Sequence, residues 1–193
     1  MTVDHRPMLV NAVAPSFPLH SPREIARLRG LVDDFWRPIG RILRSLGVPE
    51  PEIEDGLQQV YVVASAKLLD IEQGKESAFL VQVAVNVAAR YRRARARSRE
   101  TLDADATDAV AANDPSAEDN LDRERALALL NRALDRLDED LRAVFVLYEI
   151  EEMTMAEISL SLDVPSGTVA SRLRRARVEF KHAVDRLRPA GRS

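Results

Sequence analysis

Residues 153–177 have the sequence MTMAEISLSLDVPSGTVASRLRRAR, which predicts two short helices joined by a tight turn. Thr154 and Glu157 have the spacing of a capping box, in which side chains satisfy free backbone N–H groups at a helix start. The segment 163–165, Asp-Val-Pro, interrupts the helical pattern, and Ser166 can cap the second helix. This stretch therefore predicts a helix, a sharp turn and a second helix.

The second of these helices is predicted to have two different faces. At about 100° per residue, apolar residues recur on one face while hydroxyl and basic residues gather on another. A short capped helix, a sharp turn and a helix with an exposed basic face are typical of a DNA-binding helix-turn-helix. An ordinary helical hairpin with a solvated basic face is the alternative that this stretch leaves open. The candidate DNA-contacting residues are Ser166, Thr168, Ser171, Arg172, Arg174 and Arg175.

The charges of the chain are distributed unevenly. Its 193 residues suit one domain or two small ones, and the formal net charge of −3 does not by itself indicate a nucleic-acid binder. Six arginines nevertheless lie within residues 90–99, and residues 100–119 carry only acidic charges. Because fields act over about 8–10 Å at physiological salt, such blocks matter more than the net charge.

Several classes of function are not supported by the sequence. There are no cysteines and only three histidines, so neither a disulfide framework nor a metal site is predicted, and no cofactor is expected. We find no glycine-rich phosphate loop, nucleophile elbow or pair of catalytic carboxylates, so neither catalysis nor a small-molecule substrate is expected. No apolar run could span a bilayer and no signal-peptide pattern is present, which predicts a cytoplasmic protein without membrane insertion.

The first predicted helix follows a proline-containing extension, residues 1–20, which we expect to be disordered. Residues 21–24, Ser-Pro-Arg-Glu, combine an N-cap, a proline at the first helical position and the glutamate of a capping box. An apolar stripe continues to Leu46, and Pro38 is expected to kink or split the helix. The segment 47–49, Gly-Val-Pro, is expected to end it.

A second helix is predicted from about Glu52 to Leu69. Its apolar face is expected to lie in the core, while the opposite face is polar and includes an exposed valine. Such a surface suits protein docking, but a solvated face with one exposed apolar residue is an equally simple interpretation. The residues of this candidate docking face are Asp55, Gln58, Gln59 and Val62.

A third helix follows the polar loop 70–77 and has an apolar side and a basic side. Asn86 lies on the basic side with arginines one helical turn away, which suits contact with a base edge and neighbouring phosphates. Arginine-rich helix ends are also common as solvated surface, but the density of this run favours nucleic-acid contact. The candidate residues are Asn86, Arg90, Tyr91, Arg92 and Arg93.

The chain is predicted to be all-α, with two small helical domains, because no strand pattern is convincing anywhere. Residues 21–99 form the first domain and residues 120–188 the second, which comprises two further helices and the helix-turn-helix. One of those helices can be capped by Asp138. The acidic segment 100–119 lacks an apolar period, which indicates a flexible linker, and residues 189–193 form a tail.

Four segments together resemble the extracytoplasmic-function (ECF) sigma factors of bacterial RNA polymerase. Residues 55–61, DGLQQVY, are similar to the family's D-x-x-Q-x-x-F/Y motif, and residues 79–93 are similar to W-L-x-x-I-A-x-N followed by R-R. Residues 137–142, LDEDLR, resemble L-P-x-x-x-R, and residues 166–177 resemble the recognition helix G-T-V-x-S-R-x-x-R-A-R. The four motifs keep the family's order and spacing over about residues 28–187.

The resemblance implies a promoter-recognition subunit that binds the β and β′ subunits of core polymerase. The Asp55 helix would dock on the β′ clamp coiled coil, and Asn86 with the loop 71–77 would hold a base flipped out of the −10 element. The arginines after Asn86 would follow the non-template strand, and the last helix would bind the −35 element as duplex. The acidic linker would run towards the active-site cleft and RNA exit channel. An anti-sigma factor is a further partner that the resemblance implies.

Some positions depart from the family motifs. Phe79, Asp138 and Ala170 replace the usual tryptophan, proline and basic residue. The loop 71–77 is IEQGKES where F-R-G-E/D-S is common, which leaves the base preference of the −10 pocket open. Two other interpretations also remain open at this point. One is a stand-alone helix-turn-helix regulator with a helical interaction domain, and the other is an adaptor that binds polymerase without a promoter role.

Overall fold

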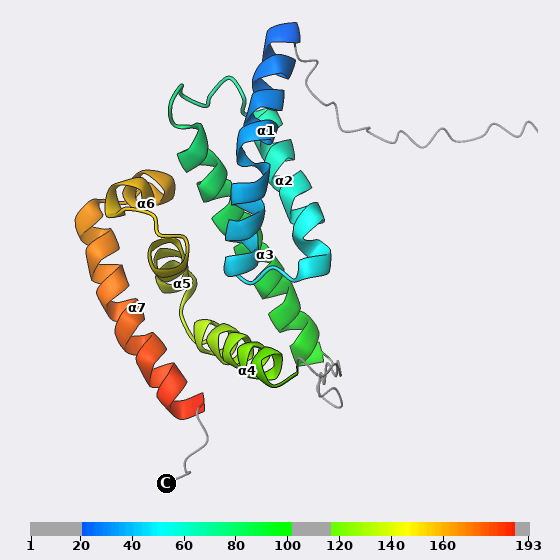
Figure 1. Ribbon diagram of the computed structural model, residues 1–193. Helices are drawn as coiled ribbons and strands as arrows, with labels where there is room; N and C mark the ends of the chain where they lie inside the picture. The colour runs from blue at the N-terminus through cyan, green and yellow to red at the C-terminus, as the bar shows by residue number, and fades with distance from the viewer. Residues whose placement is uncertain (1–20, 102–116, 188–193) are drawn as a thin grey trace, which may run out of the picture.

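The computed structural model describes residues 21–101 and 117–187, and all regular structure in these ranges is helical (Figure 1). The predicted all-α class is confirmed. The predicted extension 1–20, the tail 189–193 and most of the predicted linker lie outside the described residues. None of the described helices is long and apolar enough to cross a membrane. The elements in order are α1 (Pro22–Ser45), η1 (Glu50–Glu52), α2 (Ile53–Ala66), α3 (Glu76–Thr101), α4 (Ala117–Leu134), α5 (Glu139–Phe145), the π-helical turn η2 (Val146–Ile150), α6 (Met155–Leu162) and α7 (Ser166–Leu187).

Local sequence signals set both ends of α1. The predicted capping box is present: the Ser21 N–H donates to Glu24 Oε2 at 2.8 Å, and the Glu24 N–H donates to Ser21 Oγ at 3.3 Å. The helix is not split at Pro38, because the stripe beyond the proline, including Leu43, stays buried in the core. The chain leaves the helix at Gly47, whose φ of +92° is a left-handed conformation that glycine adopts without steric cost.

The first three helices form one unit around a shared apolar core. α2 approaches α1 closely at Gly56, where an added Cβ would lie 3.3 Å from Leu43 Cδ1. Trp36 of α1 stacks on Tyr61 of α2 with ring centroids 5.5 Å apart. Burial raises the pKa of Tyr61 to about 12, and its hydroxyl donates to the Leu31 carbonyl at 3.3 Å. These contacts fix the position of α2 relative to α1.

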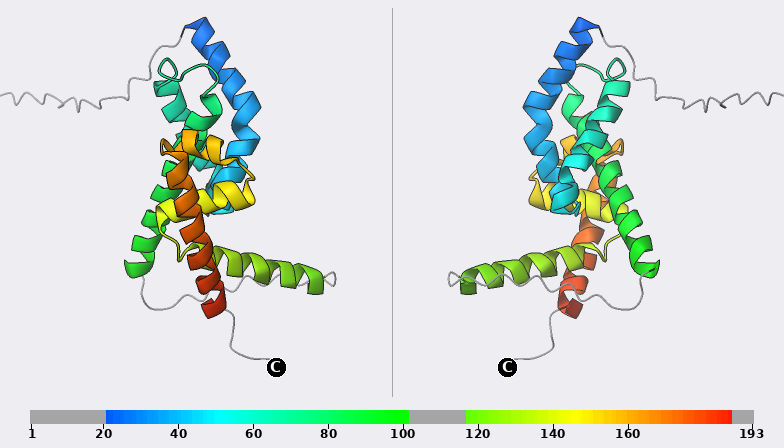
Figure 2. Two further views of the ribbon diagram at one scale, coloured as in Figure 1. Left: turned by 90° about the vertical axis from the view of Figure 1, so that its left-hand side faces the viewer. Right: turned by 90° about the vertical axis from the view of Figure 1, so that its right-hand side faces the viewer.

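The helices α4–α7 form a second unit that contains the predicted helix-turn-helix in α6 and α7. Its predicted capping box is also present, since the Thr154 N–H donates to Glu157 Oε2 at 2.8 Å and the Glu157 N–H donates to Thr154 Oγ1 at 3.2 Å. Asp163, with a left-handed φ of +51°, turns the chain sharply towards α7. Asp138 precedes α5 as predicted, but its side chain makes no capping hydrogen bond. Figure 2 shows α4 crossing α7 and projecting beyond the unit.

The two units pack against each other, mainly through α3 and α6 (Figure 1). Buried residues of both units belong to one hydrophobic cluster. Glu151, whose side chain is only 1% exposed, accepts hydrogen bonds from Arg41 Nε at 2.7 Å and from Ser45 Oγ at 2.5 Å. Arg142 of α5 is 2% exposed, and its guanidinium lies against Gly47 of the first unit while it donates to Asp135 Oδ1 of its own unit at 2.6 Å. The local sequence patterns did not predict this closed pairing of the units.

Replacing Gly47 with alanine is expected to lower the free energy of unfolding by about 2 kcal/mol. The left-handed backbone alone costs a residue with a Cβ about 1–2 kcal/mol. The new Cβ would also overlap Arg142 Nη2, so a buried guanidinium would have to move. Urea denaturation measures the change, with Gly30→Ala in the interior of α1 as the control. That alanine meets no atom within 4 Å and should be neutral or stabilising. Equal stability of the two variants would contradict the prediction.

Candidate polymerase and nucleic-acid interfaces

The exposed face of α2 and one side of α3 line a groove with a volume of about 500 Å³. Gln59 Nε2 donates to Tyr91 Oη at 2.9 Å and so joins the two helices. Burial, and then the carboxylates of Asp55 and Glu52, raise the pKa of the Tyr91 hydroxyl, which therefore stays protonated. Val62 is 52% exposed beside these polar groups. The groove brings together predicted residues of two kinds, Asp55, Gln58, Gln59 and Val62 from α2 and Asn86, Arg90 and Tyr91 from α3.

Arg92 and Arg93, two other candidate nucleic-acid contacts on α3, lie on the side of the helix that faces the second unit. Arg92 is partly buried, and its Nη1 donates to the Leu46 carbonyl at 3.0 Å. Burial, and then the charge of Arg142, lower the pKa of Arg92 to about 10, so its charge remains at neutral pH. Arg93 Nη1 donates to both carboxylate oxygens of Glu139 at 2.7 and 2.9 Å. Contact of these arginines with DNA stays a prediction, and in this arrangement the Nη1 of each arginine is already engaged within the protein.

A smaller cavity of about 170 Å³ lies between α3 and the second unit. Asn86 borders both this cavity and the groove between α2 and α3. Arg172 of α7 lines the same cavity, and its Nη2 donates to Asp140 Oδ2 on α5. In this arrangement two candidate −10 residues, Asn86 and Arg92, and one candidate −35 residue therefore share a cavity.

The other candidate residues of α7 lie on or near the surface of the second unit. Ser171 Oγ donates to the Thr168 carbonyl at 2.9 Å, so its hydroxyl proton is engaged within the helix. Arg175 Nη2 lies 3.4 Å from Glu179 Oε1, one turn further along, which is a weak contact. Ser166, Ser171, Arg174 and Arg175 are exposed, and Thr168 is partly buried.

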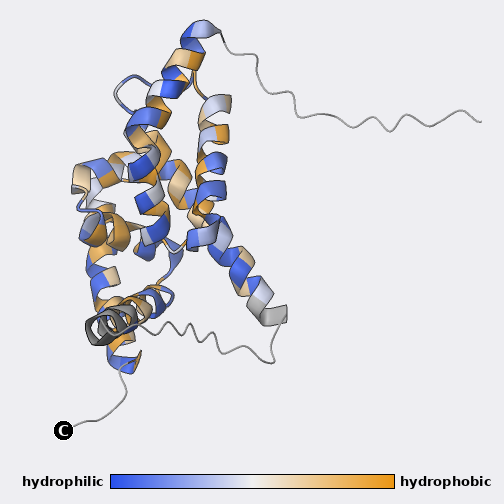
Figure 3. Cartoon of the chain, turned by 45° about the vertical axis from the view of Figure 1, so that its right-hand side comes forward, coloured by the Kyte–Doolittle hydropathy of each residue, from blue (hydrophilic) through white to orange (hydrophobic). Residues whose placement is uncertain are grey.

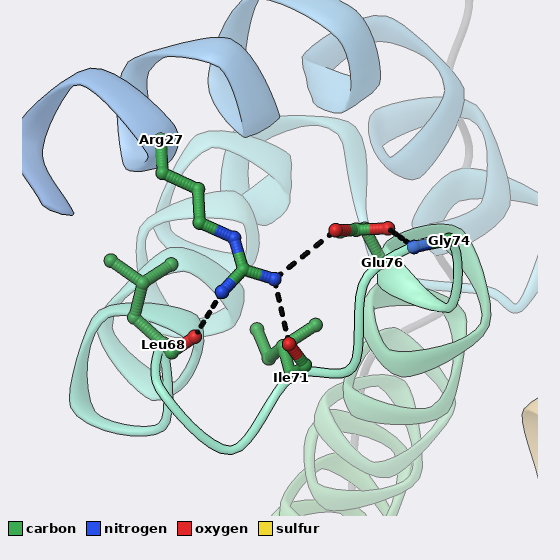
Figure 4. Close-up of polar contacts among 5 residues, drawn as sticks. All are labelled: Arg27, Leu68, Ile71, Gly74 and Glu76. Atoms are coloured by element: carbon green, nitrogen blue, oxygen red, sulfur yellow. Dashed lines mark hydrogen bonds and ion pairs between the residues drawn. The ribbon is translucent and has the colours of Figure 1, made fainter. Parts of the chain in front are cut away.

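An arginine that sequence patterns did not single out holds the loop before α3. Arg27 of α1 donates to the Leu68 carbonyl at 2.9 Å, to the Ile71 carbonyl at 2.6 Å and to Glu76 Oε1 at 3.1 Å (Figure 4). Glu76 Oε2 also accepts the Gly74 N–H at 2.6 Å. One guanidinium and one carboxylate thus fix both ends of the loop. No local motif could reveal this, because Arg27 is separated from these partners by 41, 44 and 49 residues.

The contribution of the Arg27–Glu76 contact to the free energy of unfolding should fall at acid pH. The backbone N–H of Glu76, and then Arg27 and the Gly74 N–H, lower the pKa of the Glu76 carboxyl although burial opposes them. A lowered folded-state pKa means that the contribution is complete above about pH 4.5 and is lost as the pH falls through the folded pKa. The difference in unfolding free energy between the wild type and Glu76→Gln should therefore shrink between about pH 7 and pH 3 in urea titrations. A difference that is constant over this range would refute the role of the carboxylate.

The second unit has the helix order and the turn of a DNA-binding helix-turn-helix, which is the fold of a DNA-binding transcription protein. A family model described as "Sigma-70, region 4" matches residues 127–180. Over 150 residues the chain is 33% identical to the ECF RNA polymerase sigma-E factor of Escherichia coli K12, covering 72% of this chain and 78% of that relative. The chain belongs to the family of ECF RNA polymerase sigma factors. This assignment favours a sigma factor over a stand-alone regulator.

A further relative agrees with this assignment, and two solved structures have the same fold. The ECF sigma factor SigE of Mycolicibacterium smegmatis is 30% identical over 141 residues, which cover 73% of this chain and 55% of that protein. The structure of CnrH in complex with the cytosolic domain of CnrY has a TM-score of 0.60 at 23% identity, over 84% of this chain and 90% of CnrH. The sigma factor RpoE of Bartonella quintana, in complex with the anti-sigma factor NepR, has a TM-score of 0.56 at 24% identity, over 84% and 99%. These two structures share the fold.

Proposed function

We propose that this protein binds core RNA polymerase and directs it to promoters by recognising the −10 and −35 elements. One juxtaposition carries the proposal: the polar face of α2 and Asn86 of α3 line a single groove. A polymerase surface bound to Asp55, Gln58 and Gln59 would lie directly beside the residues that contact the −10 element. Docking and recognition of the first promoter element are thereby coupled in space.

The remaining roles follow from the positions of the side chains. The loop 71–77, held by Arg27, would close over a base flipped from the −10 element. The contacts of this pocket must offset the cost of unstacking the base, which is a few kcal/mol. The end of α3 that extends past the first unit is largely hydrophilic (Figure 3) and carries the exposed Arg95, which suits a strand backbone. The exposed Arg174 and Arg175 on α7, together with Arg172, suit the major groove of the −35 duplex.

The partners of this function are the β and β′ subunits of core polymerase and promoter DNA, in the cytoplasm. An anti-sigma factor is a further proposed partner, since two proteins of the same fold were each solved with a bound partner. A tagged chain isolated from cells in which its target promoter is silent should carry a protein other than core polymerase. That protein, when purified and added to a transcription assay, should stop initiation. If the purified protein does not stop initiation, the proposed anti-sigma factor is not supported.

Transcription in vitro tests the central proposal. Core polymerase plus this protein on a pool of randomised promoters should produce transcripts from a defined sequence class, and neither component alone should do so. The absence of any promoter-specific transcript would refute the proposal. Tight, sequence-specific binding of duplex DNA by a dimer of the free chain would support the stand-alone regulator instead.

The double variant Gln58→Ala/Val62→Ala should bind core polymerase about 5- to 30-fold more weakly, since truncating two interface residues commonly costs 1–2 kcal/mol in total. Both side chains are exposed, so the fold should be unaffected. Lys67→Ala, an exposed change just after α2, is the matched control and should bind as the wild type does. Fluorescence titration of labelled chain with core enzyme measures these affinities. Equal affinity of variant and control would show that core enzyme docks elsewhere.

A further inference from the structure

The first turn of α5 contacts arginines from both units. Glu139 accepts hydrogen bonds at 2.7 and 2.9 Å from Arg93 of α3, in the first unit. Asp140, the next residue, accepts a hydrogen bond from Arg172 of α7, in the second unit. One acidic turn therefore engages two helices that are far apart in the sequence.

Both arginines belong to the surfaces proposed to contact DNA, so the inference that follows rests on the proposed function. A carboxylate offers a guanidinium a pair of anionic oxygen acceptors, as a DNA phosphate does. Arg93 Nη1 and Arg172 Nη2 are held by Glu139 and Asp140, so a phosphate or a base edge must compete with a carboxylate for each guanidinium. In this arrangement the two carboxylates thus occupy places that DNA would need.

The space beside the acidic turn is too small for a nucleic acid. The cavity that Asn86 and Arg172 share has a volume of about 170 Å³, whereas pockets for small ligands measure about 300–1,000 Å³. Contacts outside the proposed DNA-binding residues hold the same closed arrangement, since the buried Glu151 binds Arg41 across the two units. Asn86 can still be reached from the groove between α2 and α3, where it is exposed, so the closed arrangement restricts the two arginines that the acidic turn holds.

We propose that Glu139 and Asp140 act as an internal substitute for DNA phosphates, which keeps the free protein from binding DNA. In the closed state Glu139 holds Arg93 across the two units and so helps to keep them together, while Asp140 holds Arg172 within the second unit. DNA binding requires the exchange of both carboxylates for phosphates or base edges. The acidic turn thereby confines promoter recognition to conditions in which the units are separated.

The test compares the full chain with the double variant Glu139→Gln/Asp140→Asn in the absence of polymerase. Fluorescence anisotropy at a fixed salt concentration measures binding to a duplex of randomised sequence. We expect the variant to bind about 5- to 10-fold more tightly than the wild type, because two competing ion pairs are lost. The matched control is Asp33→Asn/Asp34→Asn, which removes two adjacent exposed carboxylates from α1 and should change affinity less than about twofold.

A second measurement follows the separation of the units. The chain has no cysteine, so Lys67→Cys and His182→Cys, exposed positions in the two units, can carry a donor and an acceptor dye. Energy transfer should be lower in the Glu139→Gln/Asp140→Asn variant than in the control. Both results must be found. If the variant binds DNA no more tightly than the control does, or if its energy transfer is unchanged, the proposal is wrong.

Two checks keep these results interpretable. Circular dichroism verifies that the double variant is folded, and Glu139→Gln alone provides a milder change that must alter affinity in the same direction. The randomised duplex requires no promoter preference, so this test does not depend on which elements the protein recognises. Failure of the proposed function appears instead as the absence of promoter-specific transcripts from the wild-type holoenzyme.

Discussion

Replacing Leu43 with alanine should lower the free energy of unfolding by about 2.5–5 kcal/mol, a large part of the stability of a small domain. Leu43 is completely buried in α1 and lies against Gly56 of α2. Truncation would leave a cavity between these helices, since the tight contact leaves little room for collapse. Gly56 also lies near Tyr91, so the loss should loosen the helices that form the docking groove.

Urea denaturation of the full chain measures this effect, with Leu69→Ala as the matched control. Leu69 is 79% exposed, so its truncation should change the unfolding free energy by less than about 0.5 kcal/mol. A difference between the two variants below about 1 kcal/mol would mean that the packing of α1 on α2 contributes little to stability.

Replacing Arg172 with alanine should weaken recognition of one −35 base pair by about 1–3 kcal/mol, a factor of roughly 5 to 150. Arg172 lies on α7, the second helix of the helix-turn-helix, where an arginine can donate two hydrogen bonds to a guanine edge. In the closed protein its guanidinium binds Asp140, and this bond must be released in the promoter complex. The lost contact should therefore abolish preference at one position and leave the neighbouring positions unchanged.

Holoenzyme assembled with the variant can be tested on a panel of promoters that differ at single −35 positions. Arg186→Ala is the matched control: it removes the same charge from the same helix at an exposed site, where the Arg186 Nε donates to the His182 carbonyl. The control should leave the preference intact. A loss of affinity that is equal for all promoters would assign Arg172 to a phosphate instead of a base edge.

Much of the local structure could be predicted from the sequence. Both capping boxes, at Ser21 and at Thr154, form as their spacing predicted, and the turn before α7 falls where the helical pattern is interrupted. The exposed polar face of α2 and the basic side of α3 also follow from helical periodicity. These features depend on groups within one helical turn of each other, so the order of residue types is sufficient to predict them.

Periodicity was a poorer guide to what individual arginines contact. Arg92, whose contact with a DNA strand stays a prediction, donates to the end of α1 in this arrangement, which its place on the helix did not indicate. Arg142, the last residue of the L-P-x-x-x-R-like motif, is almost fully buried, and Arg27, which no local pattern sets apart, fixes a loop more than forty residues away. An arginine has a long stem and several donors, so its partner depends on which backbone comes within reach and not on its helical face alone.

The amino-acid sequence by itself determined the helices, their caps, the helix-turn-helix and the two candidate faces on α2 and α3. Only the tertiary structure decided that these faces line one groove, that the two units close on each other, and that Glu139 and Asp140 engage arginines of the proposed DNA-binding surfaces. The physical reason is the separation along the chain of the groups that make each contact. Caps and amphipathic stripes arise from neighbours along the chain, whereas the ion pairs and the groove require helices far apart in sequence to meet through burial of a shared apolar core.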